Sequence, residues 1–474
     1  MRISGRFTRP ALATALLVAV AASAHAQAPA PRQLSKWQQL AHDIFKELIE
    51  INTEGSIGST TQAAKAMAAR LKAAGFPDSD VVVLENAPRK GNLVARLRAK
   101  NPVKKTILLL SHIDVVEAKP EDWTLPPFQL TEKADSFFAR GVSDNKDDAA
   151  IDLTLIIRLR TEGFATDRDI IVAATTDEEG GGDNGVGWLI QNHPELIQAE
   201  FGLNEGGAGR VKEGKSLSHD IQLAEKKSSN FRLEALNSGG HSSRPIKDNA
   251  ITQLADALVK LGAFDFPVHL NDVTRAYFSK SAAIVEPEMG AAMTALVANP
   301  ADAKAAAIVS TDPSYNSQLR TTCVATMLEG GHATNALPQR ARATVNCRIL
   351  PDEDPVEIQK TLVRVIDNPK VTVSAAGQAR NTKIIPLPPE LQTQIERVTS
   401  ELWPGLPVIP TMGTGATDGS RLRNAGIPTL GVAGQFYGDS NAHGMNERIP
   451  QKGFYDSLEF MYRLVTNLSR PVVP

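Results

Sequence analysis

The stretch that decides the fold is Thr106-Ile-Leu-Leu-Leu-Ser-His-Ile-Asp114, an apolar run that ends in a histidine and an acid. Residues 169–179, DIIVAATTDEE, have the same form, and shorter copies lie at 201–207 and 427–443. Continuous runs of Val, Ile and Leu are typical of strands buried on both faces. We therefore expect buried strands whose carboxyl ends carry polar side chains.

Helical patterns lie between these strands, at residues 63–74 and 147–162. Alternating strands and helices predict an α/β fold with a mostly parallel twisted sheet. Ligands of such sheets bind beyond the carboxyl ends of the strands. The polar ends of the apolar runs should therefore meet in one site.

A different pattern interrupts the α/β order. It predicts strands at 231–236, 320–328, 341–350 and 371–374, with helices at 250–261 and 355–367. Two strand-helix-strand halves predict an α+β, ferredoxin-like sandwich with a four-stranded antiparallel sheet. We expect residues 228–376 to be inserted into a main domain made of 34–227 and 377–474. The Ala-rich stretch 266–316 lies inside the insert, and the sequence assigns it no role.

The composition excludes some functions. The 474 residues are 42% hydrophobic, which suits two domains with real cores. The formal net charge of −2 leaves no basic excess for nucleic acid.

Residues 1–26 have the pattern of a secretory signal peptide. Arg2, Arg6 and Arg9 precede the apolar run 11–22, and Ala24-His25-Ala26 precedes a cut at Gln27. The other interpretation is a membrane anchor, but a run of roughly 12 residues is short of the about 20 needed to span a bilayer. We expect an exported protein, periplasmic or secreted, with no membrane attachment after cleavage.

The two cysteines, Cys323 and Cys347, fall roughly opposite each other in the predicted hairpin of the insert. In an oxidising compartment they would form a disulfide. Two buried thiols are the equal alternative.

The polar strand ends offer metal ligands. His112 and Asp114 share a strand face, which suits a ligand and the partner that orients it. Asp144 either caps a helix or bridges two ions. In Asp177-Glu178-Glu179, an exposed turn by composition, one glutamate can bind metal and the other can take a proton.

Two further blocks complete the candidate set, Asn204-Glu205-Gly206-Gly207 and Ala442-His443-Gly444. Three carboxylates, two histidines and no thiolate suit two Zn²⁺ ions, with Co²⁺ or Mn²⁺ as substitutes.

The order of these blocks resembles the co-catalytic zinc exopeptidase family, which includes aminoacylase, acetylornithine deacetylase, succinyl-diaminopimelate desuccinylase and glutamate carboxypeptidase. The matching blocks cover nearly the whole mature chain: 111–114, 123–128, 140–146, 177–179, 239–245, 335–338, Arg348, 413–418 and His443. The insert resembles the family's lid or dimerisation domain.

The resemblance implies a role for each metal-centre residue. One zinc would be held by His112 and Glu205, the other by Glu179 and His443, with Asp144 bridging both. Asp114 would orient His112, and Glu178 would be the general base. Many members have an acid where Asn204 stands, so Glu205 is expected to be the ligand. Asn145 replaces a common apolar residue, with no obvious consequence.

The resemblance also implies roles in the insert. His241 would polarise the scissile carbonyl, reaching the partner subunit's site in dimeric members. Asn335 and Arg348 would grip the substrate, and the backbone of 413–417, around Gly415, would line its pocket. An arginine fork fits a carboxylate. By the residues alone, His241 and Arg348 would be a packed loop histidine and a surface arginine.

These expectations define the function. The main one is an exported zinc-dependent metallopeptidase or amidohydrolase of carboxypeptidase or dipeptidase type, cutting the amide bond next to a free carboxylate in short peptides. An N-acyl amino acid amidohydrolase is the alternative. A non-catalytic peptide-binding protein is the remote one, and it predicts loss of a ligand or of the base. A homodimer through the insert stays open beside a monomer in which 266–316 covers that surface.

Overall fold

The computed structural model describes residues 33–471 apart from 181, 378 and 380, so the expected signal peptide lies outside the described residues. In the described part, a ten-stranded sheet has the order β1-β2-β6-β3-β7-β17-β9-β8-β18, with β16 beside β9. Its strands are β1 (Val81–Ala87), β2 (Lys90–Leu97), β3 (Ile107–His112), β6 (Ile170–Thr175), β7 (Phe201–Asn204), β8 (Gly209–Lys212), β9 (Lys215–Glu225), β16 (Val408–Gly413), β17 (Thr429–Gly431) and β18 (Phe436–Tyr437).

The centre of this sheet is parallel, as the apolar runs predict. β6, β3, β7 and β17 pair in parallel, and every residue of β3 and β6 is buried. Both flanks hold antiparallel pairs, because β1–β2 and β8–β9 are hairpins with loops of two residues. In the second loop Glu213 and Gly214 both have positive φ, as a tight hairpin turn requires. The sheet is therefore mixed rather than uniformly parallel.

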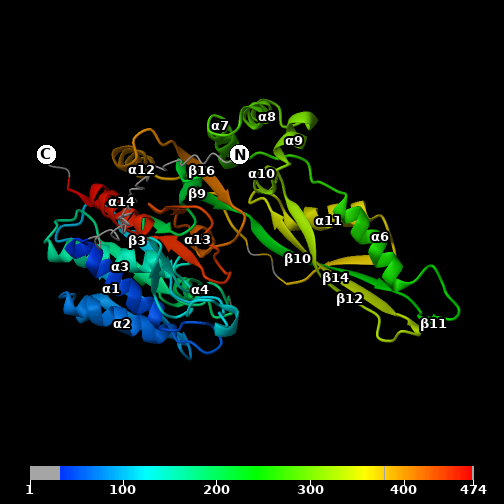
Figure 1. Cartoon of the computed structure of the whole chain (residues 1–474), viewed down its shortest axis with the longest axis horizontal. Helices are drawn as coiled ribbons and strands as arrows, with labels where there is room; N and C mark the ends of the chain where they lie inside the picture. The colour runs from blue at the N-terminus through cyan, green and yellow to red at the C-terminus, as the bar shows by residue number, and fades with distance from the viewer. Residues whose placement is uncertain (1–32, 181, 378, 380, 472–474) are drawn as a thin grey trace, which may run out of the picture. The chain divides into compact units, whose positions relative to one another are not determined.

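Helices cover both faces of the sheet (Figure 1). On one face α2 and α3 contact the strands, and α1 and α14 pack on α3. On the other face, Leu189 of α4 and Leu422 of α13 pack with Leu108 and Ile171. The bounds are α1 (Lys36–Glu50), α2 (Thr60–Ala73), α3 (Lys146–Thr161), α4 (Gly185–Asn192), α5 (Pro194–Ile197), α12 (Pro389–Leu402), α13 (Gly419–Asn424) and α14 (Gln451–Ser469), with 3-10 turns at Asp78–Asp80 and Pro120–Asp122. A small sheet joins β4 (Thr131–Lys133), β5 (Ser136–Phe138) and β19 (Arg448–Pro450).

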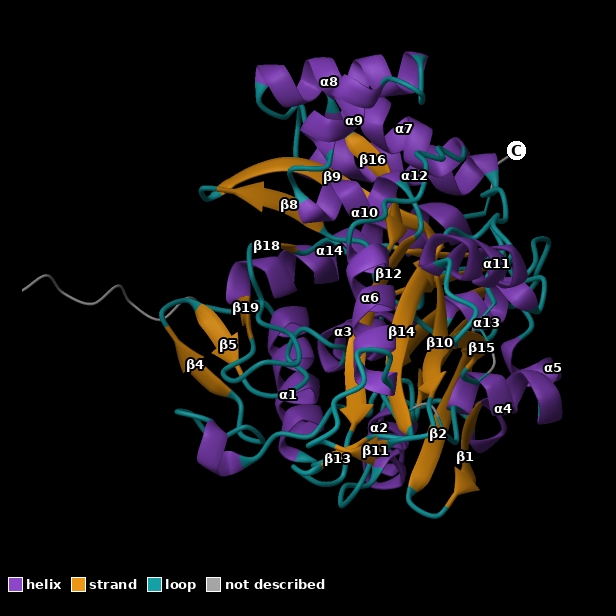
Figure 2. Cartoon of the chain, turned by 90° about the vertical axis from the view of Figure 1, so that its right-hand side faces the viewer, coloured by secondary structure: helices purple, strands orange, loops and turns teal. Residues whose placement is uncertain are grey.

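The inserted domain has the predicted four-stranded antiparallel sheet, in the order β12-β14-β10-β15. Figure 2 shows these strands side by side. Leu254 of α6 and Leu362 of α11 pack with Phe231 and Val345 on one sheet face. The bounds are β10 (Lys227–Leu236), β11 (Gly240–His241), α6 (Ala250–Gly262), β12 (Thr322–Gly330), β13 (Ala336–Leu337), β14 (Arg340–Ile349), α11 (Pro355–Ile366) and β15 (Val371–Ala375). The predicted fold class, α/β with an inserted α+β domain, is confirmed.

The Ala-rich stretch forms four helices, α7 (Asp272–Ser281), α8 (Pro287–Ala298), α9 (Ala303–Val309) and α10 (Pro313–Leu319). They pack on the main domain, because Phe278 and Met293 share a core with Ile409 of β16. Lys280 Nζ donates to the carbonyl of Val408 at 2.9 Å. The stretch thus packs against β16 of the main domain.

Cys323 and Cys347 are bonded to each other. They are direct partners in the β12–β14 register, so the disulfide ties an edge strand of the inserted sheet to its neighbour. In the structure the disulfide is formed, so the alternative of two buried thiols is wrong. Within the described residues, no helix has both the length and the apolar character needed to cross a membrane.

Candidate metal centre

The candidate ligands come from strands that end at the same edge of the sheet. His112 is the last residue of β3 and pairs with Thr175, the last residue of β6. Glu179 follows β6 by four residues, and Glu205 follows directly after β7. Because β3, β6 and β7 are parallel neighbours, these ends meet in space. Asp144 and His443 come from loops before α3 and before β19.

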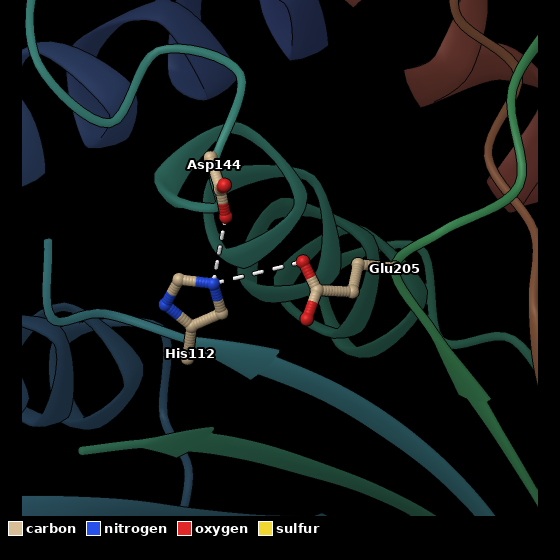
Figure 3. Close-up of side chains that lie close together, drawn as sticks. All are labelled: His112, Asp144 and Glu205. Atoms are coloured by element: carbon tan, nitrogen blue, oxygen red, sulfur yellow. Dashed lines mark hydrogen bonds and ion pairs between the residues drawn. The ribbon is translucent and has the colours of Figure 1, made fainter. Parts of the chain in front are cut away.

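The first group consists of His112, Asp144 and Glu205 (Figure 3). The distance from His112 Nε2 to Asp144 Oδ1 is 2.9 Å, and that to Glu205 Oε2 is 3.6 Å. Only His112 of the three is fully enclosed, at 3% exposed. One imidazole nitrogen and two carboxylate oxygens therefore converge on one point.

The second group consists of Asp144, Glu179 and His443. His443 Nε2 lies 2.8 Å from Glu179 Oε1 and 3.1 Å from Asp144 Oδ2. Asp144 thus presents Oδ1 to the first group and Oδ2 to the second. A carboxylate that uses one oxygen on each side is suited to bridge two ions.

The charges in the two groups shift one another's protonation. Hydrogen bonds to Asp144 and Glu179 raise the pKa of His443 to about 10. Burial lowers the pKa of His112, but the charge of Glu205 and the hydrogen bonds to Asp114 and Asp144 outweigh it and raise that pKa well above its usual value. The crowded negative charge that raises these two pKa values would equally favour bound cations. Nitrogen and oxygen donors around crowded carboxylates fit divalent metal ions.

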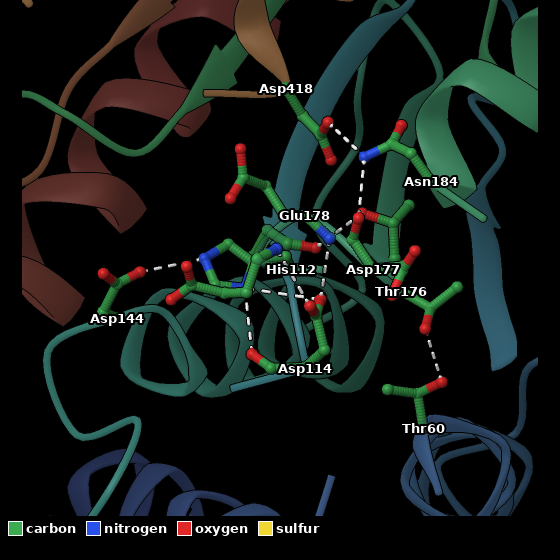
Figure 4. Close-up of polar contacts among 12 residues, drawn as sticks. Thr60, His112, Asp114, Asp144, Thr176, Asp177, Glu178, Asn184 and Asp418 are labelled. Atoms are coloured by element: carbon green, nitrogen blue, oxygen red, sulfur yellow. Dashed lines mark hydrogen bonds and ion pairs between the residues drawn. The ribbon is translucent and has the colours of Figure 1, made fainter. Parts of the chain in front are cut away.

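Asp114 has a second task that its spacing from His112 did not indicate. His112 Nδ1 lies 3.0 Å from the backbone oxygen of Asp114, and 3.6 Å from its carboxylate. That carboxylate accepts from the backbone N–H of Glu178 at 3.1 Å (Figure 4). It also accepts from the backbone N–H of Glu179 at 3.0 Å. Asp114 therefore fixes the loop that carries the candidate base and a ligand.

Two alternatives for single residues do not fit the structure. The residue before α3 is Asn145, and no side-chain hydrogen bond caps that helix, so Asp144 is not a helix cap. Asn204 is buried and donates to Thr417 Oγ1 at 3.2 Å, whereas its neighbour Glu205 faces His112. The described structure brings together the five predicted ligands; their individual roles stay predictions.

The candidates of the inserted domain do not form one group within the chain. Ser242 N donates to the carbonyl of Asn335 at 2.9 Å, which places His241 and Asn335 together at the β11–β13 pair. Arg348 lies near the other end of β14, opposite Ser228. The eight residue-to-residue steps from Arg340 to Arg348 along β14 span roughly 26 Å. The predicted pair of Asn335 and Arg348 is therefore separated along the sheet.

His241 is exposed, and a hydrogen bond from Ser243 favours one tautomer of its ring. The backbone N–H of Ser243 donates to His241 Nδ1 at 3.1 Å. In the neutral ring the proton must then be on Nε2. An outward Nε2–H is the kind of donor that polarises a carbonyl.

The loop 413–417 is fixed by hydrogen bonds to the buried side chain of Glu225. Thr417 N and Thr417 Oγ1 donate to Glu225 at 2.9 and 2.7 Å. Glu225 also pairs with Arg423, and both side chains are 1% exposed. Gly415 itself is exposed, with open space where a side chain would project. A buried ion pair thus fixes a loop whose tip is open, a role that sequence alone did not reveal.

Fold and donor set together define a metal-dependent enzyme with a divided α/β main domain. The chain belongs to Peptidase family M20/M25/M40, whose sequence model matches residues 108–467. Members of this family are metal-dependent hydrolases of amide or peptide bonds, and this protein is one of them.

Its relatives include both peptidases and acyl-amino acid enzymes. It is 25% identical to the mouse N-fatty-acyl-amino acid synthase/hydrolase PM20D1, over 78% of this chain and 76% of that protein. It is 28% identical to a probable carboxypeptidase S-like 2 of Dictyostelium discoideum, over 83% and 78%. It is 27% identical to rat aminoacylase-1A, over 82% and 87%.

Solved structures share the fold. The chain superimposes on an M20 family metallo-carboxypeptidase of Sulfolobus solfataricus with a TM-score of 0.66 and 20% identity, covering 91% of this chain and 99% of that one. It is also similar to a dinuclear metal-binding M20 peptidase of Bacillus subtilis, with a TM-score of 0.57 and 10% identity over 92% and 99%.

Proposed function

We propose that this protein is an exported two-zinc exopeptidase that hydrolyses the amide bond next to a free carboxylate in short peptides. The observation that carries the proposal is the pair of ligand groups that share Asp144. The histidine nitrogens and carboxylate oxygens of the two groups suit zinc, with cobalt or manganese as substitutes. The candidate base Glu178 is next in sequence to the ligand Glu179, on the loop that Asp114 holds.

The chemistry divides between the metals and the chain. Two bound zinc ions would supply Lewis acidity toward the carbonyl and the attacking water. Glu178 takes a proton from that water and passes it to the leaving amine. His241 donates its Nε2–H to the carbonyl oxygen, on which negative charge develops. Arg348 binds the free carboxylate, a role that suits its planar fork.

The second candidate is an N-acyl amino acid amidohydrolase. The names of two relatives, an aminoacylase and an N-fatty-acyl-amino acid synthase/hydrolase, favour it. Both reactions cut an amide next to a free carboxylate, so Arg348 serves either one. The remote alternative of a non-catalytic binding protein predicts a lost ligand or base, and this chain keeps all of them.

We also propose a homodimer formed through the inserted domain. β12 is an edge strand, and its Met327 and Leu328 are 60% and 69% exposed. On α6, Ile251 and Val259 are 46% and 71% exposed, and Ile251 lines a small apolar pocket with Leu328. An open strand edge flanked by apolar side chains is suited to pair with a second copy. His241 and Asn335 would then act in the partner's site.

Export is the remaining part of the proposal. The Cys323–Cys347 disulfide supports it, because disulfides persist in oxidising compartments and are rare in the cytosol. Its test is the N-terminal sequence of the protein recovered from the culture medium or periplasm. A chain starting at Gln27 is expected, and an intact Met1 in the cytosol would contradict export.

The substrate test uses the zinc-loaded protein with dipeptides and N-acyl amino acids of the same C-terminal residue. A peptidase gives kcat/KM values at least tenfold higher on dipeptides. The opposite ranking would replace the peptidase by the amidohydrolase. No turnover on either series would overturn both.

A further inference from the structure

The two loops that carry Asp144 and His443 are both joined to the short antiparallel pair of β5 and β19. β5 pairs with β19 through Phe138 and Arg448. The chain leaves β5 toward Asp144, and it enters β19 from His443. Ala139 N donates to the carbonyl of Glu447 at 3.2 Å, which extends the contact beyond the ladder. The two loops therefore diverge from one point on their way to the second ligand group.

Glu447 is fully buried at this point, at 0% exposed, and its carboxylate binds the loop that leads to Asp144. Oε1 accepts from Ser143 N at 2.8 Å and from Ser143 Oγ at 2.9 Å. Oε2 accepts from Gly141 N at 3.1 Å and from Arg140 Nη1 at 2.7 Å. Every donor in this set lies within four residues before Asp144.

Arg140 makes the reverse connection. It is 2% exposed, and its Nη2 donates to the carbonyls of His443 and Gly444, both at 3.1 Å. Arg140 and Glu447 therefore each bind the other's loop. One hydrogen-bonded unit contains the residue before Asp144 and the backbone of His443.

We propose that Arg140 and Glu447 are a positioning pair that sets the distance between Asp144 and His443 and so builds the second metal site. The inference rests on the two-metal centre and is independent of the substrate. Burying two charges is costly unless they are paired and hydrogen-bonded, and here both conditions are met. Loss of either partner leaves the other charge buried without its counter-charge.

The two metal sites should depend on this pair unequally. His112 and Glu205 are fixed at the ends of β3 and β7, strands in the buried centre of the sheet. His443 is 53% exposed on its side chain and lies on a loop, where φ is +64°. Arg140 ties the backbone of this loop at His443 and Gly444 to the chain segment that leads to Asp144.

The test measures Zn²⁺ binding to the chelator-stripped full chain, by competition with a chromophoric chelator at fixed pH. The wild type is expected to bind two equivalents. Glu447→Gln should weaken the site of His443 by about 10- to 100-fold, the usual effect of losing a partner that orients a ligand. The site of His112 should weaken less, because only the shared Asp144 connects it to the pair. Wild type that binds fewer than two ions would overturn the two-metal centre, and this inference with it.

Milder and control variants separate positioning from folding. Ser143→Ala removes one hydrogen bond to Glu447 and should weaken the site of His443 about two- to tenfold. Leu464→Ala leaves a cavity in the core against which α14 packs, because Leu464 is 0% exposed. It should lower Tm while leaving both zinc affinities unchanged.

A double variant gives the sharpest readout. Because Arg140 and Glu447 act as one unit, Arg140→Met combined with Glu447→Gln should weaken the second site by less than the product of the two single-variant losses. The proposal is wrong if Glu447→Gln leaves both zinc affinities intact or weakens both sites equally. It is also wrong if the loss of zinc affinity in the double variant equals the product of the two single losses. A loss of zinc affinity in Leu464→Ala as large as that in Glu447→Gln would assign the effect to folding.

Discussion

The main domain brings its candidate residues together, whereas the inserted domain keeps its candidate residues apart. In the main domain the ligands meet within one chain, and buried carboxylates such as Asp114 and Glu447 hold the loops that carry them. In the inserted domain, His241 lies in the separate β11–β13 pair, whereas Arg348 lies in β14 of the four-stranded sheet, near the end opposite Arg340. His241 is exposed there, whereas His112 of the metal centre is 3% exposed.

This difference indicates that the two domains contribute in different ways to the candidate site. The metal centre is preorganised, because its geometry is fixed by contacts made on folding. The proposed substrate residues lie apart in the described chain, so our proposal has them reach the metals by domain closure or through a second copy. Variants in the main domain should therefore affect chemistry or metal binding, and variants in the inserted domain should affect how the site is completed.

The largest effect is expected for Glu178→Gln. A general base typically contributes 10²- to 10⁴-fold, so kcat should fall within that range. Zinc content should stay at two, because Glu178 belongs to neither ligand group. Metal analysis beside steady-state kinetics checks both parts. A near-normal rate would show that another group is the base.

His241→Ala tests the contribution of the inserted domain. Loss of an oxyanion donor should lower kcat about 10²- to 10³-fold with unchanged zinc affinity. The matched control is His269→Ala, because His269 is a half-exposed histidine that pairs with Asp352 and Glu353, away from the ligand groups. Its rate should equal that of the wild type.

Mixing inactive variants tests whether His241 acts across a dimer. Glu178→Gln and His241→Ala chains, refolded or co-expressed together, should regain activity, because one site of a mixed dimer has both groups intact. A mixture as inactive as its parents would place His241 in its own chain's site. A wild-type protein that is monomeric by light scattering would also place it there.

Replacing both cysteines by alanine tests whether the stability of the inserted domain is independent of the metal centre. The disulfide closes a loop of 24 residues in sequence, for which its loss should cost about 3 kcal/mol of unfolding free energy. The loss should fall on the inserted domain. Denaturant unfolding followed together with zinc affinity checks it, and a weakened metal centre would contradict the independence of the two domains.

The smallest effect concerns His219, a buried histidine of the main domain. It lies between Thr399 Oγ1 and the carbonyl of Ala433, and burial lowers its pKa to about 4. The unfolded ring binds a proton near pH 6.5, so stability is lost as pH falls from 6.5 toward 4. Between pH 6.5 and 5 the loss is about 2 kcal/mol. His219→Gln should flatten that slope; an unchanged slope would assign it to other groups.

Much of this architecture was predictable, because it depends on local patterns. Apolar runs that end in His112, Glu179 and Glu205 reveal strands and their shared edge without any long-range information. The positioning pair was not predictable, since Arg140 and Glu447 are 307 residues apart and only the fold brings them together. The same holds for the placement of 266–316 on β16. Ala-rich helices reveal an apolar face and not its partner.

The most direct test of the central claim compares one N-acyl amino acid or dipeptide with its C-terminal amide, using stripped and zinc-restored protein. We predict no hydrolysis with chelator, recovery with two zinc equivalents, and a kcat/KM on the free carboxylate at least tenfold above that on the amide. Arg348→Ala should remove most of this preference. Equal rates on acid and amide, or full activity in chelator, would contradict a two-zinc hydrolase that recognises a free carboxylate.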